Sequence, residues 1–247
     1  MSEFYIGYLP KAPAATARFI KKVVAGLAAV AATAAITLVL SQMPFARSTF
    51  EFGHSRKFEG VVASTPYPML LIPRPGSNES SQYLLVAPGK QGADSVVAGL
   101  DGKRVRLRGQ LIYSGAETMV EIDPHTIEVV ERSPNATAET VNLGSATLTG
   151  EIVDSKCYLG VMNPGRGKVH RDCAARCVSG GIPPALLTST GEIFLLVNHD
   201  GKPFPQDFLR QLVGELVVIR GDLIRRGETK IMQAHNIRHH SVLTAGE

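Results

Sequence analysis

The chain has 247 residues, of which 44% are apolar and 19% are charged, and its formal net charge is +4. This apolar content is enough to form folded cores, so extensive disorder is excluded. The length suits one large domain or two small ones. Lys and Arg form no long basic run and there is no Trp, so neither charge nor base stacking favours a nucleic-acid partner.

The N-terminal segment predicts a membrane anchor. Residues 1–22 are polar and basic, whereas residues 23–46 contain no charged side chain. As a helix, such a span reaches about 36 Å, which is enough to cross a hydrocarbon core of about 30 Å. Basic residues precede the span and only Arg47 follows it closely, so the positive-inside rule predicts a cytoplasmic segment at 1–22 and an exported remainder. A cleaved signal peptide is the alternative.

Two stretches beyond the anchor repeat one pattern. The segment 105–112 (VRLRGQLI) matches the segment 217–224 (VVIRGDLI), and apolar residues alternate with arginines at the start of the first copy. A period of two is typical of half-buried strands. The repeat therefore predicts that the chain after the anchor contains two copies of one β-domain.

Each copy contains the pattern of five strands, with a short helix between the third and the fourth. This order is the plan of an OB-fold, so we expect a mainly β protein in which one transmembrane helix precedes two tandem OB-like five-stranded barrels. A plain β-sandwich is the alternative. The expected parts are the helices Asp94–Leu100 and Gln206–Leu212, the domains 47–133 and 145–247, and the linker 134–144.

The second copy carries an insertion. In the first copy 24 residues separate Gly60 from Leu84, whereas 45 residues separate the equivalent Gly150 and Leu195. The excess lies at 156–182 and holds every cysteine of the chain. Because the first copy is complete without it, the insertion is not needed to build a barrel. Additions to a rigid scaffold commonly carry function.

The insertion presents four candidate metal ligands. The pattern at Lys168–Val178 predicts a short helix, and the following pair of glycines predicts its end. Three ligands lie along one face of this helix, at positions i, i+3 and i+7. The fourth comes from the end of the preceding strand. The four residues are Cys157, His170, Cys173 and Cys177.

The sequence allows three interpretations of these residues. A disulfide from Cys157 to Cys173 or Cys177 would clamp the insertion. Alternatively, the three thiolates and the imidazole of His170 would form a tetrahedral site for zinc or iron. The third interpretation is a redox-active or copper-handling thiol site that also uses Met162.

Basic residues lie near the cysteines in the sequence. Positive charge beside a thiol lowers its pKa and favours the thiolate. A docking surface for an acidic partner and a plain solvated face are the alternatives. The residues are Lys156, Arg166, Lys168, Arg171 and Arg176.

The segment from Gly150 to Pro184 contains the pattern D-S-K-C…H-R-x-C-A-x-x-C…G-G-I-P-P. It resembles a motif of poorly characterised bacterial membrane-anchored periplasmic proteins. The resemblance implies a place beside periplasmic or membrane electron-transfer systems and implies no established chemistry. The tandem barrels resemble bacterial periplasmic OB-fold proteins.

These features predict a non-catalytic accessory subunit of a respiratory or photosynthetic electron-transfer complex. Its Ala-rich span would pack among other transmembrane helices in the bacterial inner membrane, and its periplasmic β-domains would dock on partner subunits and stabilise them. No nucleophile–base set, phosphate loop or paired carboxylates stand out, so we do not expect an enzyme. The alternative function is a periplasmic metal-binding or thiol-redox protein centred on the four candidate ligands.

Overall fold

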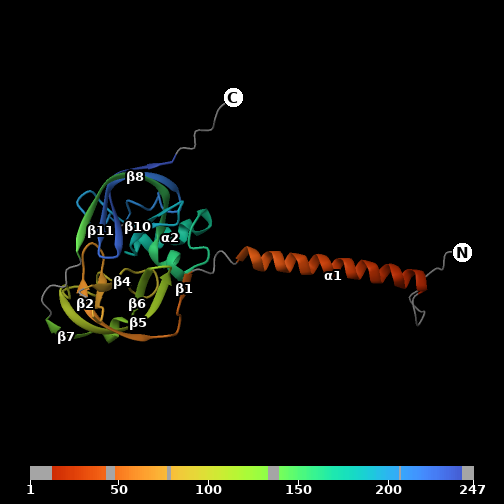
Figure 1. Ribbon diagram of the computed structural model, residues 1–247, viewed down its shortest axis with the longest axis horizontal. Helices are drawn as coiled ribbons and strands as arrows, with labels where there is room; N and C mark the ends of the chain where they lie inside the picture. The colour runs from red at the N-terminus through yellow and green to blue at the C-terminus, as the bar shows by residue number, and fades with distance from the viewer. Residues whose placement is uncertain (1–12, 43–47, 77–78, 133–138, 206, 241–247) are drawn as a thin grey trace, which may run out of the picture. The chain divides into compact units, whose positions relative to one another are not determined.

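A computed structural model describes residues 13–42, 48–76, 79–132, 139–205 and 207–240 (Figure 1). The chain divides into two compact units, Met1–Ala46 and Arg47–Glu247. The first contains one long helix and the second contains all the described strands. The protein is therefore mainly β, with an N-terminal apolar helix.

The N-terminal unit is the helix α1 (Ala14–Gln42), rich in alanine, a strong helix former. Its apolar stretch has a mean hydropathy of 2.4, and it is long enough to cross a membrane, although a signal sequence shares these properties. The helix begins at Ala14 rather than at residue 23, so Lys21 and Lys22 belong to it. The end of the predicted span, at 43–46, lies outside the described residues.

Arg47–Glu247 is one compact unit that contains two sheets. Residues 48–132 form a seven-stranded sheet, and we use the term first β-domain for this part of the unit. Its strand pairings lead from β5 through β2, β3, β4 and β6, and β6 pairs with β5 again. The pair β4–β6 is parallel, while β1 and β7 add antiparallel to β5. The strands are β1 (Ser48–Phe50), β2 (Arg56–Ala63), β3 (Met69–Pro73), β4 (Ser80–Val86), β5 (Lys103–Ser114), β6 (Glu117–Ile122) and β7 (Glu128–Arg132).

Residues 140–239 of the same unit form a closed five-stranded barrel in the order β10-β12-β11-β8-β9, and we use the term second β-domain for this part. Its pair β10–β12 is parallel and the others are antiparallel. Strand β8 begins at Thr140, inside the segment expected to be a linker. The strands are β8 (Thr140–Asp154), β9 (Pro184–Thr188), β10 (Ile193–Val197), β11 (Leu216–Arg226) and β12 (Thr229–His239).

The sequence repeat corresponds to equivalent strand pairings. Gly60 of β2 lies opposite Val105 of β5, and Gly150 of β8 lies opposite Val217 of β11. A Cβ added to Gly60 would come within 2.5 Å of a backbone carbonyl oxygen, and one added to Gly150 would come within 2.4 Å of another. Both positions therefore require glycine because a neighbouring strand approaches closely.

The expected short helices are not formed. Turns occupy the segment at Asp94–Leu100, where the amide of Val97 bonds to Ala93 but that of Leu100 bonds to Val97. The segment expected to form the second helix, Gln206–Leu212, also consists of turns from residue 207 onward, and Gln206 lies outside the described residues. One turn of helix gains few hydrogen bonds for the residues it orders, so such short segments do not sustain a regular α-helix.

One apolar core cluster spans both β-domains. Tyr67, Met69 and Ile112 of the first domain pack in the same buried cluster as Leu159 and Ile182 of the second. The Tyr67 hydroxyl also donates a 2.6 Å hydrogen bond to the carbonyl of Leu196. Because Leu159 and Ile182 come from the predicted insertion, this segment is part of the contact between the domains.

Candidate metal centre

The insertion folds into two short helical turns and one α-helix between β8 and β9. A single wide turn covers Cys157–Val161, a 3-10 turn covers Lys168–His170, and the helix α2 covers Arg171–Ser179. The helix expected at Lys168–Val178 is formed only from Arg171 onward, because its first three residues make the 3-10 turn. Its glycine stop is confirmed, since Gly180 caps α2 and Gly181 has a φ of +93°. This end turns the chain back toward β9.

The end of α2 lies directly against the loop that follows β4. The amide of Gly92 donates a 2.9 Å hydrogen bond to the carbonyl of Gly180. A Cβ added to Gly180 would lie 1.8 Å from the carbonyl oxygen of Lys90, and one added to Gly92 would lie 2.3 Å from that of Gly181. The glycines thus bring the Lys90 loop within reach of the cysteines.

The three cysteines form one cluster, in which all three sulfurs lie within 4.8 Å of one another. Cys157 and Cys177 are buried and their Sγ atoms are 3.9 Å apart, while Cys173 is partly exposed. All three are free thiols. A disulfide requires about 2.05 Å between sulfurs, so the structure does not contain the disulfide that was one interpretation of the sequence.

His170 belongs to a second group with Asp154 and Cys157, whose ligand atoms also lie within 4.8 Å of one another. Its Nε2 is 3.0 Å from Asp154 Oδ2, and both side chains are buried. The other oxygen of Asp154 accepts a 2.8 Å hydrogen bond from the amide of Cys157. Among the described residues, the four predicted ligands therefore fall into two groups that share Cys157.

Lys90 supplies the positive charge at the cluster. Its Nζ lies 2.7 Å from Cys173 Sγ and 3.7 Å from Cys177 Sγ. The hydrogen bond with Cys173 raises the pKa of Lys90, so this side chain carries its charge at neutral pH. The sequence pattern does not point to Lys90 because this residue lies in the other β-domain.

The contact between the two buried cysteines shifts their pKa values in opposite directions. The hydrogen bond with Cys157 lowers the pKa of Cys177, and Lys90 contributes further to this decrease. The same hydrogen bond, together with burial, raises the pKa of Cys157. The two pKa values therefore move apart, and Cys177 is the more acidic thiol of the pair.

The predicted role of Lys156 beside the thiols is wrong. Its side chain is 2% exposed and its Nζ forms a 2.5 Å ion pair with Glu121 of β6. The same nitrogen donates to the carbonyls of Ala87 and Gly89. These acceptors hold Lys156 against the first β-domain, so its charge serves the domain contact.

The other predicted basic residues lie at the surface of the insertion. Arg171 is paired with Glu215 at 2.8 Å. The remaining three are exposed, and they are Arg166, Lys168 and Arg176. The charge that reaches the sulfurs therefore comes from Lys90 and not from these neighbours in the sequence.

The sequence did contain a signal for Asp154. This residue opens the D-S-K-C segment, three residues before Cys157, and an acceptor at this spacing commonly binds a following backbone amide.

Met162, considered as a copper ligand, is 44% exposed. The described cluster therefore consists of three thiols, an Asp–His pair and one lysine.

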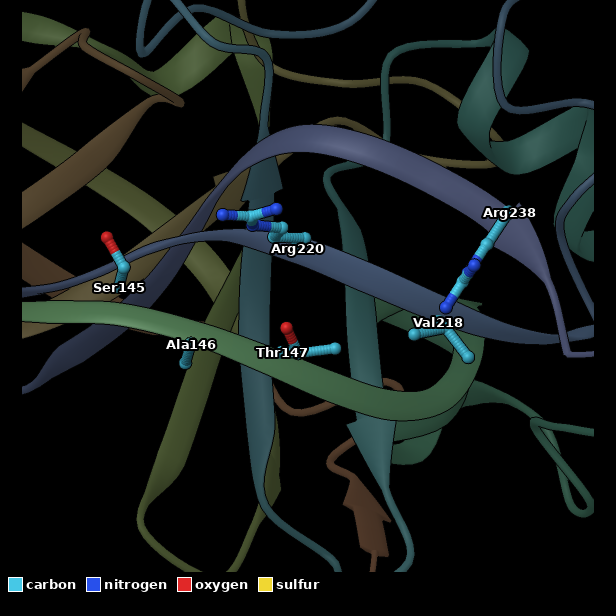
Figure 2. A pocket seen from close by; sticks show the side chains of 6 residues that line it. All are labelled: Ser145, Ala146, Thr147, Val218, Arg220 and Arg238. Carbon is cyan, nitrogen blue, oxygen red and sulfur yellow. The ribbon is translucent and has the colours of Figure 1, made fainter.

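A separate hollow of about 510 Å³ lies on the outside of the barrel (Figure 2). Figure 2 shows Arg238 extending toward Val218, with Arg220 on the neighbouring part of the barrel surface. The lining residues are Ser145, Ala146, Thr147, Val218, Arg220 and Arg238. None of them is a cysteine, histidine or carboxylate, so this hollow offers no metal-ligand set.

Comparison with family models, curated proteins and solved structures found no match for this chain. The chemistry of the site therefore rests on the cluster itself. Cysteine thiolates are soft ligands that favour zinc, copper(I) and iron–sulfur centres, and the donor set here is of that kind.

Proposed function

We propose that this protein binds one thiophilic metal ion, zinc or iron, through Cys157, Cys173 and Cys177. The observation that carries the proposal is the 3.9 Å separation of the Cys157 and Cys177 sulfurs. Two thiolates on one tetrahedral zinc, each about 2.3 Å from the ion, stand about 3.8 Å apart. The pair therefore needs little movement to bind the same ion.

The charges around the cluster also favour a bound cation with three thiolates. Three thiolates and one divalent ion leave one net negative charge, which the Lys90 ammonium 2.7 Å from Cys173 offsets. Asp154 holds the amide of Cys157 and orients His170, as partners behind metal ligands commonly do. The fourth coordination position is open to water, to His170 after a side-chain movement, or to a ligand of the protein's function.

The setting that we propose is the periplasmic face of a bacterial inner membrane. Helix α1 would cross the membrane with the N-terminus in the cytoplasm, in agreement with the basic residues before the apolar stretch. Both β-domains would be OB-like barrels. Their common pairing scheme, with a parallel third and fifth strand, supports this proposal.

Metal analysis and thiol counting together test the metal site. The full chain is purified in mild detergent without added metal, and zinc and iron are measured by elemental analysis. We expect one metal ion per chain, with three thiols that become reactive toward a colorimetric reagent only after chelation. A chain that holds no metal, and takes up none when zinc is supplied to the reduced protein, would contradict the proposal.

Cysteine variants locate the bound ion. Serine at Cys157, Cys173 or Cys177 should abolish stoichiometric zinc binding, because two thiolates bind zinc far more weakly than three. Thr190→Ser is the control, since Thr190 is an exposed residue of the same barrel and its substitution leaves every sulfur in place. Zinc binding by all three cysteine variants equal to that of the control would place the ion elsewhere.

The second candidate function is the accessory subunit of a membrane electron-transfer complex. The observation that favours it is the exposure of apolar side chains along α1, among them Leu27, Val30 and Leu38. Ala-rich helices of this kind allow close packing with neighbouring transmembrane helices. Native membranes solubilised in mild detergent should release the protein in a large complex, and migration of the chain alone would oppose this candidate.

A further inference from the structure

One short contact joins the two β-domains at the edge of the cysteine cluster. Lys90 Nζ and Cys173 Sγ are 2.7 Å apart. Hydrogen bonds from N–H to oxygen measure about 2.7–3.2 Å, and sulfur is a larger atom than oxygen. Nitrogen and sulfur therefore lie closer than a hydrogen bond to a thiol requires. Two single bonds through one small bridging atom would span this separation.

We propose that Lys90 and Cys173 form a covalent N–O–S bridge when the reduced, metal-free protein meets dioxygen. The bridge would be an oxidative modification site made by two side chains that lie 83 positions apart in the sequence. It deepens the proposed function, on which its metal-linked consequence rests, because it removes one of the three thiolate ligands. The bridge itself forms without metal, so it is testable whether or not the metal site exists.

The reaction balances with dioxygen as the only oxidant. The amine of Lys90 and the thiol of Cys173 together hold three hydrogens. One oxygen atom of dioxygen becomes the bridge, with new N–O and O–S bonds, and one hydrogen stays on nitrogen. The other oxygen atom leaves as water with the remaining two hydrogens. Four electrons pass from the nitrogen–sulfur pair to dioxygen, whose O–O bond breaks.

The same balance predicts reversal by a dithiol reductant. Two dithiol molecules deliver four electrons and four protons, and each becomes a cyclic disulfide. The products are the lysine amine, the cysteine thiol and one water molecule. The bridge is therefore a reversible state of the cysteine, in contrast to sulfinic and sulfonic acids.

The geometry selects Cys173 among the three cysteines. Cys177 Sγ is 3.7 Å from Lys90 Nζ, and Cys157 Sγ lies 3.9 Å from Cys177 Sγ within the buried pair. Cys173 is the partly exposed member, so dioxygen reaches it most readily. Within the described part of the chain Lys90 forms no ion pair with a carboxylate, and its nitrogen is directed at sulfur.

The bridge has a mechanical and a chemical consequence. Lys90 lies between β4 and β5 of the first domain, while Cys173 lies on α2 of the second, so the bridge joins the two domains covalently. A bridged Cys173 also cannot bind a metal as a thiolate. Metal binding and bridge formation are therefore mutually exclusive, and a bound ion protects the site from oxidation.

Intact-mass spectrometry tests the bridge. The full chain in detergent is reduced and chelated, and one half is kept anaerobic while the other is exposed to air. We expect the aerated chain to gain one oxygen atom and lose two hydrogens, and a dithiol to restore the original mass. Gain of oxygen alone would indicate a sulfenic acid, and loss of two hydrogens alone a disulfide. Either of these, or no change, would overturn the proposal.

Peptide mapping and variants locate the bridge. Trypsin should fail to cleave after Lys90, and the peptide that contains it should be joined to peptide 172–176. Lys90→Arg and Cys173→Ser should each abolish the mass change, whereas Lys168→Arg, in the same insertion, should retain it. Cys177→Ser should also retain the mass change. If the Cys177→Ser variant shows no mass change in air, Cys173 is not the partner of Lys90.

A zinc titration of the anaerobic, reduced chain separates the two proposals. A chain that forms the bridge but binds no zinc would refute the metal site and leave the bridge intact. A chain that binds zinc but shows no mass change in air after chelation would refute the bridge alone. Zinc added before air should suppress the mass change.

Discussion

Lys156 and Glu121 form a buried ion pair at 2.5 Å between the two β-domains. Lys156 begins the insertion and Glu121 lies on β6, so the pair links the segment that carries the cysteines to the first domain. Two further hydrogen bonds to the carbonyls of Ala87 and Gly89 satisfy the ammonium group. The insertion is therefore anchored on both sides, by its own barrel and by the other domain.

We expect Lys156→Ala to destabilise the fold by about 3–5 kcal/mol, because the substitution leaves the Glu121 carboxylate buried without its partner. Denaturant unfolding of the full chain in detergent measures this free energy. Lys168→Ala is the matched control, since Lys168 is exposed in the same insertion. A loss no larger than that of the control would mean that the pair does not hold the domains together.

Asp154→Asn should weaken zinc binding about 10–100-fold. Asp154 is fully buried, and its two oxygens contact the Cys157 amide and His170 Nε2. The substitution removes the negative charge that orients both groups. Competition with a chromogenic chelator measures the affinity, and Asp172→Asn is the control because Asp172 lies exposed on α2. Equal affinities of the two variants would remove Asp154 from the site.

Gly180→Ala should destabilise the contact between α2 and the Lys90 loop by about 1–3 kcal/mol, as overpacking commonly does. The new methyl group would overlap the Lys90 carbonyl, and backbone atoms cannot rotate away as a side chain can. Gly26→Ala, with nothing within 4 Å of its new Cβ, is the control. Thermal unfolding of both variants checks the prediction, and similar midpoints would contradict it.

Glu117→Gln should raise stability at neutral pH. Burial raises the pKa of Glu117; Lys230 opposes this increase and Glu228 adds to it. A raised folded-state pKa stabilises the fold below the ordinary carboxyl pKa of about 4.3, and this contribution is lost as pH rises through the folded-state value. The gain of the variant should therefore shrink as pH falls through the raised folded-state pKa, and it should be absent below about pH 4. Melting temperatures of the protein and of Glu117→Gln at neutral pH and below about pH 4 test this prediction. A stability gain that is larger at the acid pH would contradict it.

Much of the fold could be predicted from the sequence because the patterns that indicate its helix and strands are local. An uncharged run of residues predicts the apolar helix, and alternation around Val105 and Val217 predicts the paired strands that the structure contains. The short helices failed for a local reason as well, since single turns near Gly99 lack the length that sustains a helix. The end of helix α2 was predicted correctly because Gly180 and Gly181 mark it, whereas α2 starts at Arg171 and not at Lys168.

Some features of the cysteine cluster could be predicted from the sequence, and others are determined only by the tertiary structure. The sequence by itself determined that three cysteines and His170 occupy one inserted segment, because insertion and spacing are properties of the chain. Only the tertiary structure decided that His170 pairs with Asp154, that Lys156 faces Glu121, and that Lys90 reaches Cys173. Lys90 and Cys173 meet because two domains pack, and no spacing within either domain encodes that contact.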